Sequence, residues 1–140
     1  MTESKPVTFD VKSEIEKVKQ FARTWNQLYA AEKFEAMKEL ATEDVGIANA
    51  PESTSGTGLI YGRQAYYDGI VGAYRGSSSK EKNLLVMQYE GWEYLPMPDG
   101  LHFYTIGTYT LQPSTVGVNC WLLRRDSPAA PWRVFRVINN

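Results

Sequence analysis

The chain has 140 residues, and its 15 basic and 16 acidic side chains give a formal net charge of −1 at neutral pH. The charges are interspersed along the sequence, so no basic run is present to attract nucleic acid or an anionic membrane, and neither partner is expected. A chain of this length buries a sizeable core, and we expect one domain that needs no disulfide or metal to hold it together.

Two further features of the composition bear on localisation and cofactors. The opening segment MTESKPVTFDVKSEIEK is polar and charged, without the apolar core of a signal peptide, so we expect a cytoplasmic protein. Cys120 is the one cysteine and His102 the one histidine of the sequence. They cannot form an internal disulfide, and they do not make a ligand set for zinc or a two-histidine iron site. The glycines of SGTGLIYG lack the spacing of a dinucleotide-binding loop. Neither a metal nor a cofactor is therefore expected.

The first half of the chain shows helical periodicity. We expect residues 1–9 to be a flexible arm and residues 10–140 to form the single domain, because apolar residues recur at helical spacing only beyond the arm. They predict a first helix over 11–29, capped by Asp10, and a shorter second helix over 33–40 that follows a tight turn.

A short strand and a third helix follow. β-Branched residues alternate over 45–49, which predicts a strand that ends before Pro51. A polar loop over 52–58 leads to Gly62, which can cap a third helix over 63–74. Residues 76–83 are expected to be a linker.

Beyond this linker the apolar period changes from helical to two. Four long strands are predicted, over 84–95, 101–112, 116–125 and 132–138, separated by the turn sequences PMPDG, PSTVG and DSPAAP. They are apolar on both faces, as Trp121 and Leu122 illustrate, so both faces of the sheet need a cover. Three helices cover one face, and a second copy of the chain is the expected cover of the other, giving a homodimer through the outer sheet face.

Three segments carry a resemblance to a known family: WNQLYAAEKFEAMKELATEDV, IYGRQAYYDGI and WLLRRDSPAAPWRVFRVI. With the order of elements, they resemble the nuclear transport factor 2-like superfamily, especially its SnoaL-like polyketide cyclase and ketosteroid isomerase-like branch, over residues 10–140. The resemblance implies an α+β fold in which three N-terminal helices pack on a strongly curved antiparallel β-sheet, a cone-shaped α+β barrel with an internal pocket. This fold hosts isomerases, dehydratases, cyclases, epoxide hydrolases and non-catalytic binding subunits, so it leaves the function open.

The sequence departs from the catalytic pattern that the resemblance implies. Ketosteroid isomerase-like members use an aspartate late in the first strand as a base, with a tyrosine on the first helix and a second, protonated acid at the oxyanion. These positions fall at Asn49, near Thr24 and near Asn119 in this chain. An amide cannot take up a proton, so that mechanism lacks its base here. The His–Asp dyad of dehydratases requires His102 in the pocket.

Polar and aromatic residues with chemistry suited to a pocket are the candidate site. An asparagine offers a donor and an acceptor, a tyrosine adds a hydroxyl to apolar area, and an arginine in an apolar strand can pair with a ligand carboxylate or phosphate. His102 is the candidate catalytic residue, because it titrates near neutrality. The predicted ligand-binding residues are Trp25, Tyr29, Asn49, Tyr66, His102, Tyr104, Asn119 and Arg136.

Structural interpretations of three of these residues stay open beside the functional ones. Asn49 can bond to the following loop, and His102 can be a half-exposed hairpin residue beside Glu93 or Asp99. Arg136 can form an ion pair with a helix acid, for which the candidates are Glu32, Glu35 and Asp44, or it can be exposed at the sheet edge.

Three functions remain open from the sequence. The first is a homodimeric protein that binds a small, mainly apolar ligand in the cone pocket, which the missing base favours. The second is a lyase, isomerase or cyclase-type enzyme, SnoaL-like or dehydratase-like, that acts on a small cyclic or polyketide-like substrate through His102, Asn49 and tyrosine hydroxyls. A His102 that faces the cavity and bonds to a carboxylate favours this second function. The third is a protein interaction module that uses the outer sheet face.

Overall fold

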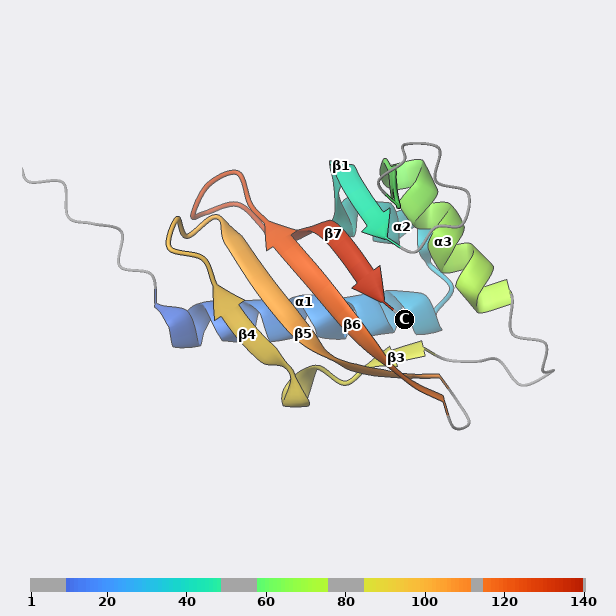
Figure 1. Ribbon diagram of the computed structural model, residues 1–140, viewed down its shortest axis with the longest axis horizontal. Helices are drawn as coiled ribbons and strands as arrows, with labels where there is room; N and C mark the ends of the chain where they lie inside the picture. The colour runs from blue at the N-terminus through green and yellow to red at the C-terminus, as the bar shows by residue number, and fades with distance from the viewer. Residues whose placement is uncertain (1–9, 49–57, 76–84, 112–114, 140) are drawn as a thin grey trace, which may run out of the picture.

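The computed structural model describes residues 10–48, 58–75, 85–111 and 115–139 (Figure 1). The predicted arm at 1–9, the candidate Asn49 and the predicted linker at 76–83 lie outside these residues.

The three predicted helices are confirmed. Helix α1 (Val11–Ala30) begins at Asp10, whose carboxylate accepts from the backbone N–H of Ser13 at 3.3 Å. Its apolar residues recur at steps of four and three, which buries one face of the helix. The second predicted helix is one turn of α2 (Phe34–Met37) that tightens into the 3₁₀ turn η1 (Lys38–Leu40), and the third is α3 (Arg63–Arg75).

The strands in the described residues form one curved, open sheet. They are β1 (Ala41–Ala48), β2 (Leu59–Tyr61), β3 (Leu85–Met87), β4 (Glu93–Pro96), β5 (His102–Leu111), β6 (Thr115–Arg124) and β7 (Arg133–Asn139). The order across the sheet is β2-β1-β7-β6-β5-β3, and β4 also pairs with β5. The predicted α+β fold of helices on a curved sheet is therefore confirmed.

One pair of strands departs from the predicted antiparallel pattern. Strand β1 lies parallel to β7, because the last strand returns to the sheet beside the first in the same direction. Strand β1 also begins at Ala41, four residues before the predicted start, and β2 was not predicted. Only the tertiary pairing reveals these features, since residues 41–44 have no alternating apolar pattern.

The predicted strand over 84–95 is two strands. Between β3 and β4 the chain makes the 3₁₀ turn η2 (Tyr89–Gly91), and Trp92 then lies over Gly107 of β5. A Cβ atom at Gly107 would stand 1.8 Å from the Trp92 ring, so a glycine is needed at this position. The Trp92 indole N–H donates to the Thr108 carbonyl at 2.9 Å, which fixes the ring there. Packing of this one tryptophan thus interrupts the strand.

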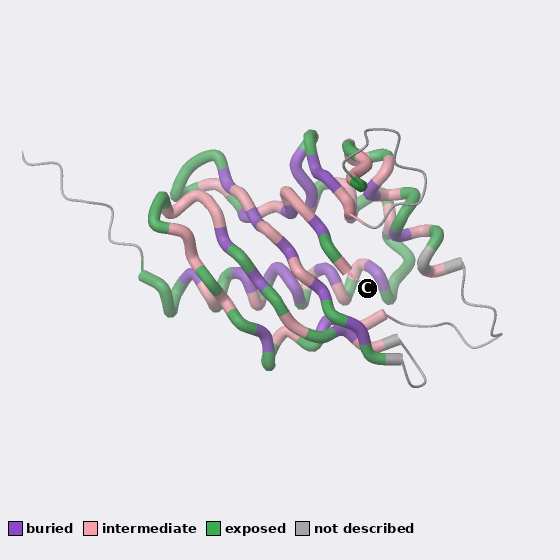
Figure 2. The backbone as a smooth tube through the Cα atoms, viewed as in Figure 1, coloured by how far each residue is buried: buried purple, intermediate pink, exposed green. Residues whose placement is uncertain are grey.

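The main core lies between α1 and one face of the sheet. In Figure 1, α1 crosses behind the sheet, and in Figure 2 the strands alternate between buried and more exposed residues along their length. Phe103, Trp121 and Leu123 face α1 and are almost wholly buried. None of the helices in the described ranges has the length and apolar character needed to span a bilayer.

Candidate functional site

A buried amide in the middle of the sheet is the most unusual polar group of the core. The inward residues of β6 are every second one, and Asn119 takes an inward position between Gly117 and Trp121. Its side chain is 0% exposed, and within the described residues neither its Nδ2 nor its Oδ1 forms a hydrogen bond. A buried amide normally satisfies both groups, so this side chain has an unused donor and an unused acceptor.

A tyrosine hydroxyl in the last turn of α1 is also buried without a hydrogen bond from the described residues. Tyr29 stacks on Trp25 with ring centroids 5.1 Å apart, and in the described part of the chain its hydroxyl has no hydrogen-bond partner. Burial, followed by the nearby Tyr74, raises the pKa of Tyr29 to about 12. At neutral pH the phenol is therefore protonated and can donate a hydrogen bond.

The two unpartnered groups lie toward the same end of the core. Along α1, Glu14 contacts Arg125 at the end of β6, and Trp25 contacts Trp121 with centroids 6.0 Å apart. Moving toward the C-terminus of α1 therefore corresponds to moving toward the N-terminus of β6. One helical turn beyond Trp25 is Tyr29, and the next inward residue of β6 is Asn119.

The other two inward candidates are already paired. The Trp25 indole N–H donates to the Tyr66 hydroxyl at 3.0 Å, which joins α1 to α3 inside the core. Burial raises the pKa of Tyr66, and the bond from Trp25 only partly offsets this rise. Trp25 and Tyr66 thus position the aromatic wall, while Tyr29 and Asn119 keep their polar groups unused.

Three predicted site residues lie on the opposite face of the sheet. His102 and Tyr104 alternate with the buried Phe103 and so point outward, and Tyr104 is 41% exposed. His102 Nδ1 lies 2.7 Å from the Asp99 carboxylate, a hairpin contact outside the core. The arrangement that favours a catalytic histidine, a carboxylate partner facing the cavity, is therefore not formed by His102.

Arg136 also belongs to the outer face. Its guanidinium donates to the Asp44 carbonyl at 3.1 Å and lies over the Phe135 ring at 3.8 Å. Among the described residues Arg136 makes no ion pair. Its contact with Asp44 is to the backbone carbonyl, whereas one interpretation of the sequence paired Arg136 with an acidic side chain. The structure thus joins Trp25 to Tyr29 and Tyr66 and places Asn119 in the same buried core, whereas His102, Tyr104 and Arg136 lie on the outer face.

A buried ion pair was missed by the sequence reasoning. Glu14 accepts from Arg125 at 3.0 Å and from the Trp132 indole N–H at 3.0 Å, and all three side chains are buried. Burial works to raise the pKa of Glu14, but the bonds from Trp132 and Lys17 and the charge of Arg125 outweigh it, so the pKa lies below its ordinary value. The signal was present, because Glu14 precedes Val18 by four residues on the apolar face of the helix.

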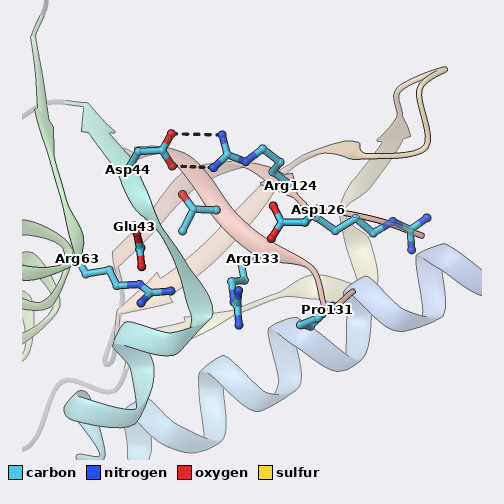
Figure 3. Close-up of a pocket in the computed structure, with 9 residues that line it drawn as sticks. Glu43, Asp44, Arg63, Arg124, Asp126, Pro131 and Arg133 are labelled. Atoms are coloured by element: carbon cyan, nitrogen blue, oxygen red, sulfur yellow. Dashed lines mark hydrogen bonds and ion pairs between the residues drawn. The ribbon is translucent and has the colours of Figure 1, made fainter. Parts of the chain in front are cut away.

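A second region is hollowed at the sheet edge. A cavity of about 420 Å³ lies between β1 and the turn from β6 to β7 (Figure 3). Four arginines line it, among them Arg63 and Arg133, which sequence reasoning did not single out. The described residues bring no three His, Cys, Asp or Glu side chains together in a way that could hold a metal ion. The predicted internal pocket between α1 and the sheet stays a prediction.

No protein-family model matches this sequence, and no curated protein matches it. A nuclear transport factor 2-like protein of unknown function from Pseudomonas putida superposes with a TM-score of 0.64 at 12% identity, over 92% of this chain and 87% of that chain. One from Novosphingobium aromaticivorans, with a cystatin-like fold, gives a TM-score of 0.55 at 23% identity, over 89% and 79%. The chain has the nuclear transport factor 2-like fold. The fold that the sequence resemblance implies is thereby confirmed.

The nuclear transport factor 2-like fold of this chain is also similar to that of a Mycobacterium tuberculosis protein solved in complex with estradiol-17β-hemisuccinate. The TM-score is 0.51 at 14% identity, over 88% of this chain and 92% of that chain. At such identities the likeness is one of fold, and the function must be argued from the residues of this chain.

Proposed function

We propose that this chain binds a small, mainly apolar ligand between α1 and the sheet, with Tyr29 and Asn119 contacting the polar group of the ligand. The observation that carries the proposal is the Asn119 side chain, which is wholly buried and, in the described residues, forms no hydrogen bond through either amide atom. An unsatisfied buried donor or acceptor costs about 1–3 kcal/mol. A ligand carbonyl or hydroxyl that meets this amide removes the cost.

The surroundings of these two groups define the ligand class. Trp25, Trp92 and Trp121 supply apolar area around them, with Trp92 and Trp121 in edge-to-face contact at 5.1 Å. Rings of this kind bind flat apolar skeletons, while a small number of polar groups fix the orientation. The steroid ester held by the Mycobacterium tuberculosis protein supports a ligand of this type for the same fold.

The chemistry of the core favours binding over proton transfer. A tyrosine with a pKa raised to about 12 donates a hydrogen bond but does not act as a base near neutrality. Glu14 is the buried carboxylate among the described residues, and Arg125 and Trp132 already occupy it. The groups facing the ligand can therefore polarise and orient it.

A thermal-shift experiment on the full chain tests this proposal. The probes are estradiol, 2-naphthol and geraniol, each with a hydroxyl on an apolar skeleton. A probe at 100 times its dissociation constant stabilises the fold by about 2.7 kcal/mol, a shift of a few degrees. We expect Asn119→Leu and Tyr29→Phe to reduce the probe-dependent shift, and the matched outer-face variant Tyr104→Phe to retain it. The absence of a shift with every probe, or an equal loss in Tyr104→Phe, would overturn the proposal.

We also propose that the outer sheet face pairs with a second copy of the chain. Its exposed apolar residues include Val116, which is 66% exposed, and Ile138, which is 52% exposed. Val118 follows Val116 on the same face of β6, and Ile106 and Ile138 flank Cys120 from β5 and β7. A continuous apolar surface of this kind on a sheet marks an interface. Light scattering is expected to give a dimer mass, which Val118→Glu lowers to that of a monomer while Gln27→Glu on the exposed side of α1 leaves it unchanged. A monomeric wild-type chain would contradict this.

A further inference from the structure

The cavity at the sheet edge arises from a break in strand pairing. Strands β1 and β7 pair at Ala41 with Val134 and again at Gly46 with Arg136. On β1 four residues lie between these two pairs, whereas on β7 only Phe135 lies between them. The longer β1 segment therefore leaves the ladder, and the cavity of about 420 Å³ lies beside it (Figure 3). This volume is within the range of about 300–1,000 Å³ for small-molecule sites.

Two arginines are anchored to backbone carbonyls at this cavity. Arg63 donates its Nε–H to the Ala41 carbonyl at 2.9 Å, and Arg133 donates its Nε–H to the Glu39 carbonyl at 3.2 Å. The two carbonyls are two residues apart in the chain, so both side chains are anchored at the start of β1. Arg63 comes from α3 and Arg133 from the start of β7, and both line the cavity (Figure 3). Neither forms an ion pair with any residue that the structure describes, and within these residues the terminal N–H groups of both guanidiniums make no hydrogen bond.

The other charged groups of the cavity are engaged or solvated. Arg124 makes two bonds to the Asp44 carboxylate, at 2.7 and 3.3 Å, and Arg125 bonds Glu14 at 3.0 Å. The bond from Arg124 is the main cause that lowers the pKa of Asp44. Glu43 and Asp126 also line the cavity, but both are exposed and retain their hydration. The partly buried Arg63 and Arg133 therefore have more to gain from an added anion than these carboxylates lose.

A neutral hydroxyl completes the set of donors. Thr42 lines the cavity and is 8% exposed, and within the described residues its Oγ1 reaches no partner at full hydrogen-bond geometry. A weak hydrogen bond to Asp44 contributes to the lowered pKa of that carboxyl. A buried hydroxyl with no more than this weak contact keeps the capacity to donate to a ligand oxygen in the cavity.

We propose that this cavity binds a phosphate group, held by the guanidiniums of Arg63 and Arg133 and by the Thr42 hydroxyl. A phosphate dianion has oxygens enough to accept from two planar guanidiniums and a hydroxyl at once. The remaining volume accommodates the organic part of a phosphomonoester. This site is separate from the core between α1 and the sheet, so the inference does not rest on the proposed binding function.

Calorimetric titration of the full chain with inorganic phosphate and with phenyl phosphate, at low ionic strength, tests the site. A charge-assisted hydrogen bond contributes about 1.5–3 kcal/mol, so Arg63→Gln and Arg133→Gln are each expected to weaken binding about tenfold or more. Arg23→Gln on the exposed side of α1 has the same change in charge and is expected to leave binding unchanged. Tighter binding of phenyl phosphate than of inorganic phosphate assigns the site to phosphomonoesters, and equal binding assigns it to free phosphate.

The variant Glu43→Gln keeps both arginines in place and guards against a trivial loss of folding. Removing this carboxylate from the cavity wall is expected to strengthen phosphate binding, because it removes a like charge beside the anion. A failure of the wild-type chain to bind either probe, an equal loss in Arg23→Gln, or weaker binding in Glu43→Gln would overturn the proposal.

Discussion

Two groups of buried polar side chains, each with one member on α1, differ in whether hydrogen bonds satisfy them. Near the start of α1, Glu14 receives hydrogen bonds from Arg125 and Trp132 and is fully partnered. Near its end, the Tyr29 hydroxyl and the Asn119 amide are equally buried, yet no hydrogen bond reaches them from the described residues. The first group is charged and satisfied, whereas the second is neutral and unsatisfied.

This difference distinguishes a structural role from a binding role. The Glu14 cluster fixes the start of α1 to the turn between β6 and β7, and its charges are stable only because each has a partner. The Asn119 group gives nothing to the stability of the empty fold, since its hydrogen-bonding capacity is lost on burial and not regained. A hydrogen-bonding partner, such as the ligand proposed above, would recover this lost capacity.

The largest expected effect comes from breaking the satisfied group. Glu14→Gln leaves the Arg125 charge buried without its carboxylate, and we expect it to lower the free energy of unfolding by about 3–5 kcal/mol. Urea unfolding followed by tryptophan fluorescence measures this loss. Glu16→Gln is the control, because Glu16 lies two residues further along α1 and is exposed. It should change the free energy of unfolding by less than about 0.5 kcal/mol. Equal changes in the free energy of unfolding for the two variants would show that the pair of Glu14 and Arg125 makes no specific contribution to stability.

Acid should act on the same group. The pKa of Glu14 is lowered in the folded state from its ordinary value of 4.5, so its contribution to stability is present above that value and is lost as pH falls through the lower, folded pKa. The melting temperature of the wild-type chain is expected to fall over this acidic range. Glu14→Gln removes the titrating group and should flatten that part of the curve; an unchanged slope would contradict the assignment.

Replacing the unsatisfied amide of Asn119 should have the opposite effect on the free energy of unfolding. Asn119→Leu removes a buried donor and acceptor and is expected to raise the free energy of unfolding of the ligand-free chain by about 1–3 kcal/mol. Asn26 provides the matched control, because its amide bonds both the N–H and the C=O of Met87, at 2.9 and 3.1 Å. Asn26→Leu should therefore destabilise. If urea unfolding gives both variants the same sign, the comparison between the two groups fails.

The smallest effect is expected from Tyr29 at alkaline pH. Its folded pKa of about 12 exceeds the ordinary value of 10.0, so its contribution is complete below pH 10 and is lost as pH rises toward the folded value. Tyr29→Phe should make the melting temperature less sensitive to pH in this range, while Tyr104→Phe on the outer face should leave the sensitivity unchanged. Differential scanning fluorimetry at several alkaline pH values measures the slopes.

Local sequence pattern predicted most of the elements. The spacing of apolar residues placed α1 and α3 to within about a residue, and alternation did the same for β5, β6 and β7. It failed where packing decides, as when Trp92 over Gly107 divides one predicted strand into β3 and β4. It also gave no sign of the parallel pairing of β1 with β7, because residues far apart in the chain make that ladder.

The sequence by itself determined the helices, the long strands and the likeness to the nuclear transport factor 2-like fold, because periodicity and turn chemistry are local properties. The tertiary structure alone decided which polar side chains meet. A strand presents alternate residues to opposite faces, so Tyr104 and Asn119 were equal candidates until the register placed one outside and the other in the core. Likewise, Arg63 and Arg133 are distant in sequence, and the carbonyls of Ala41 and Glu39 anchor them at the same cavity.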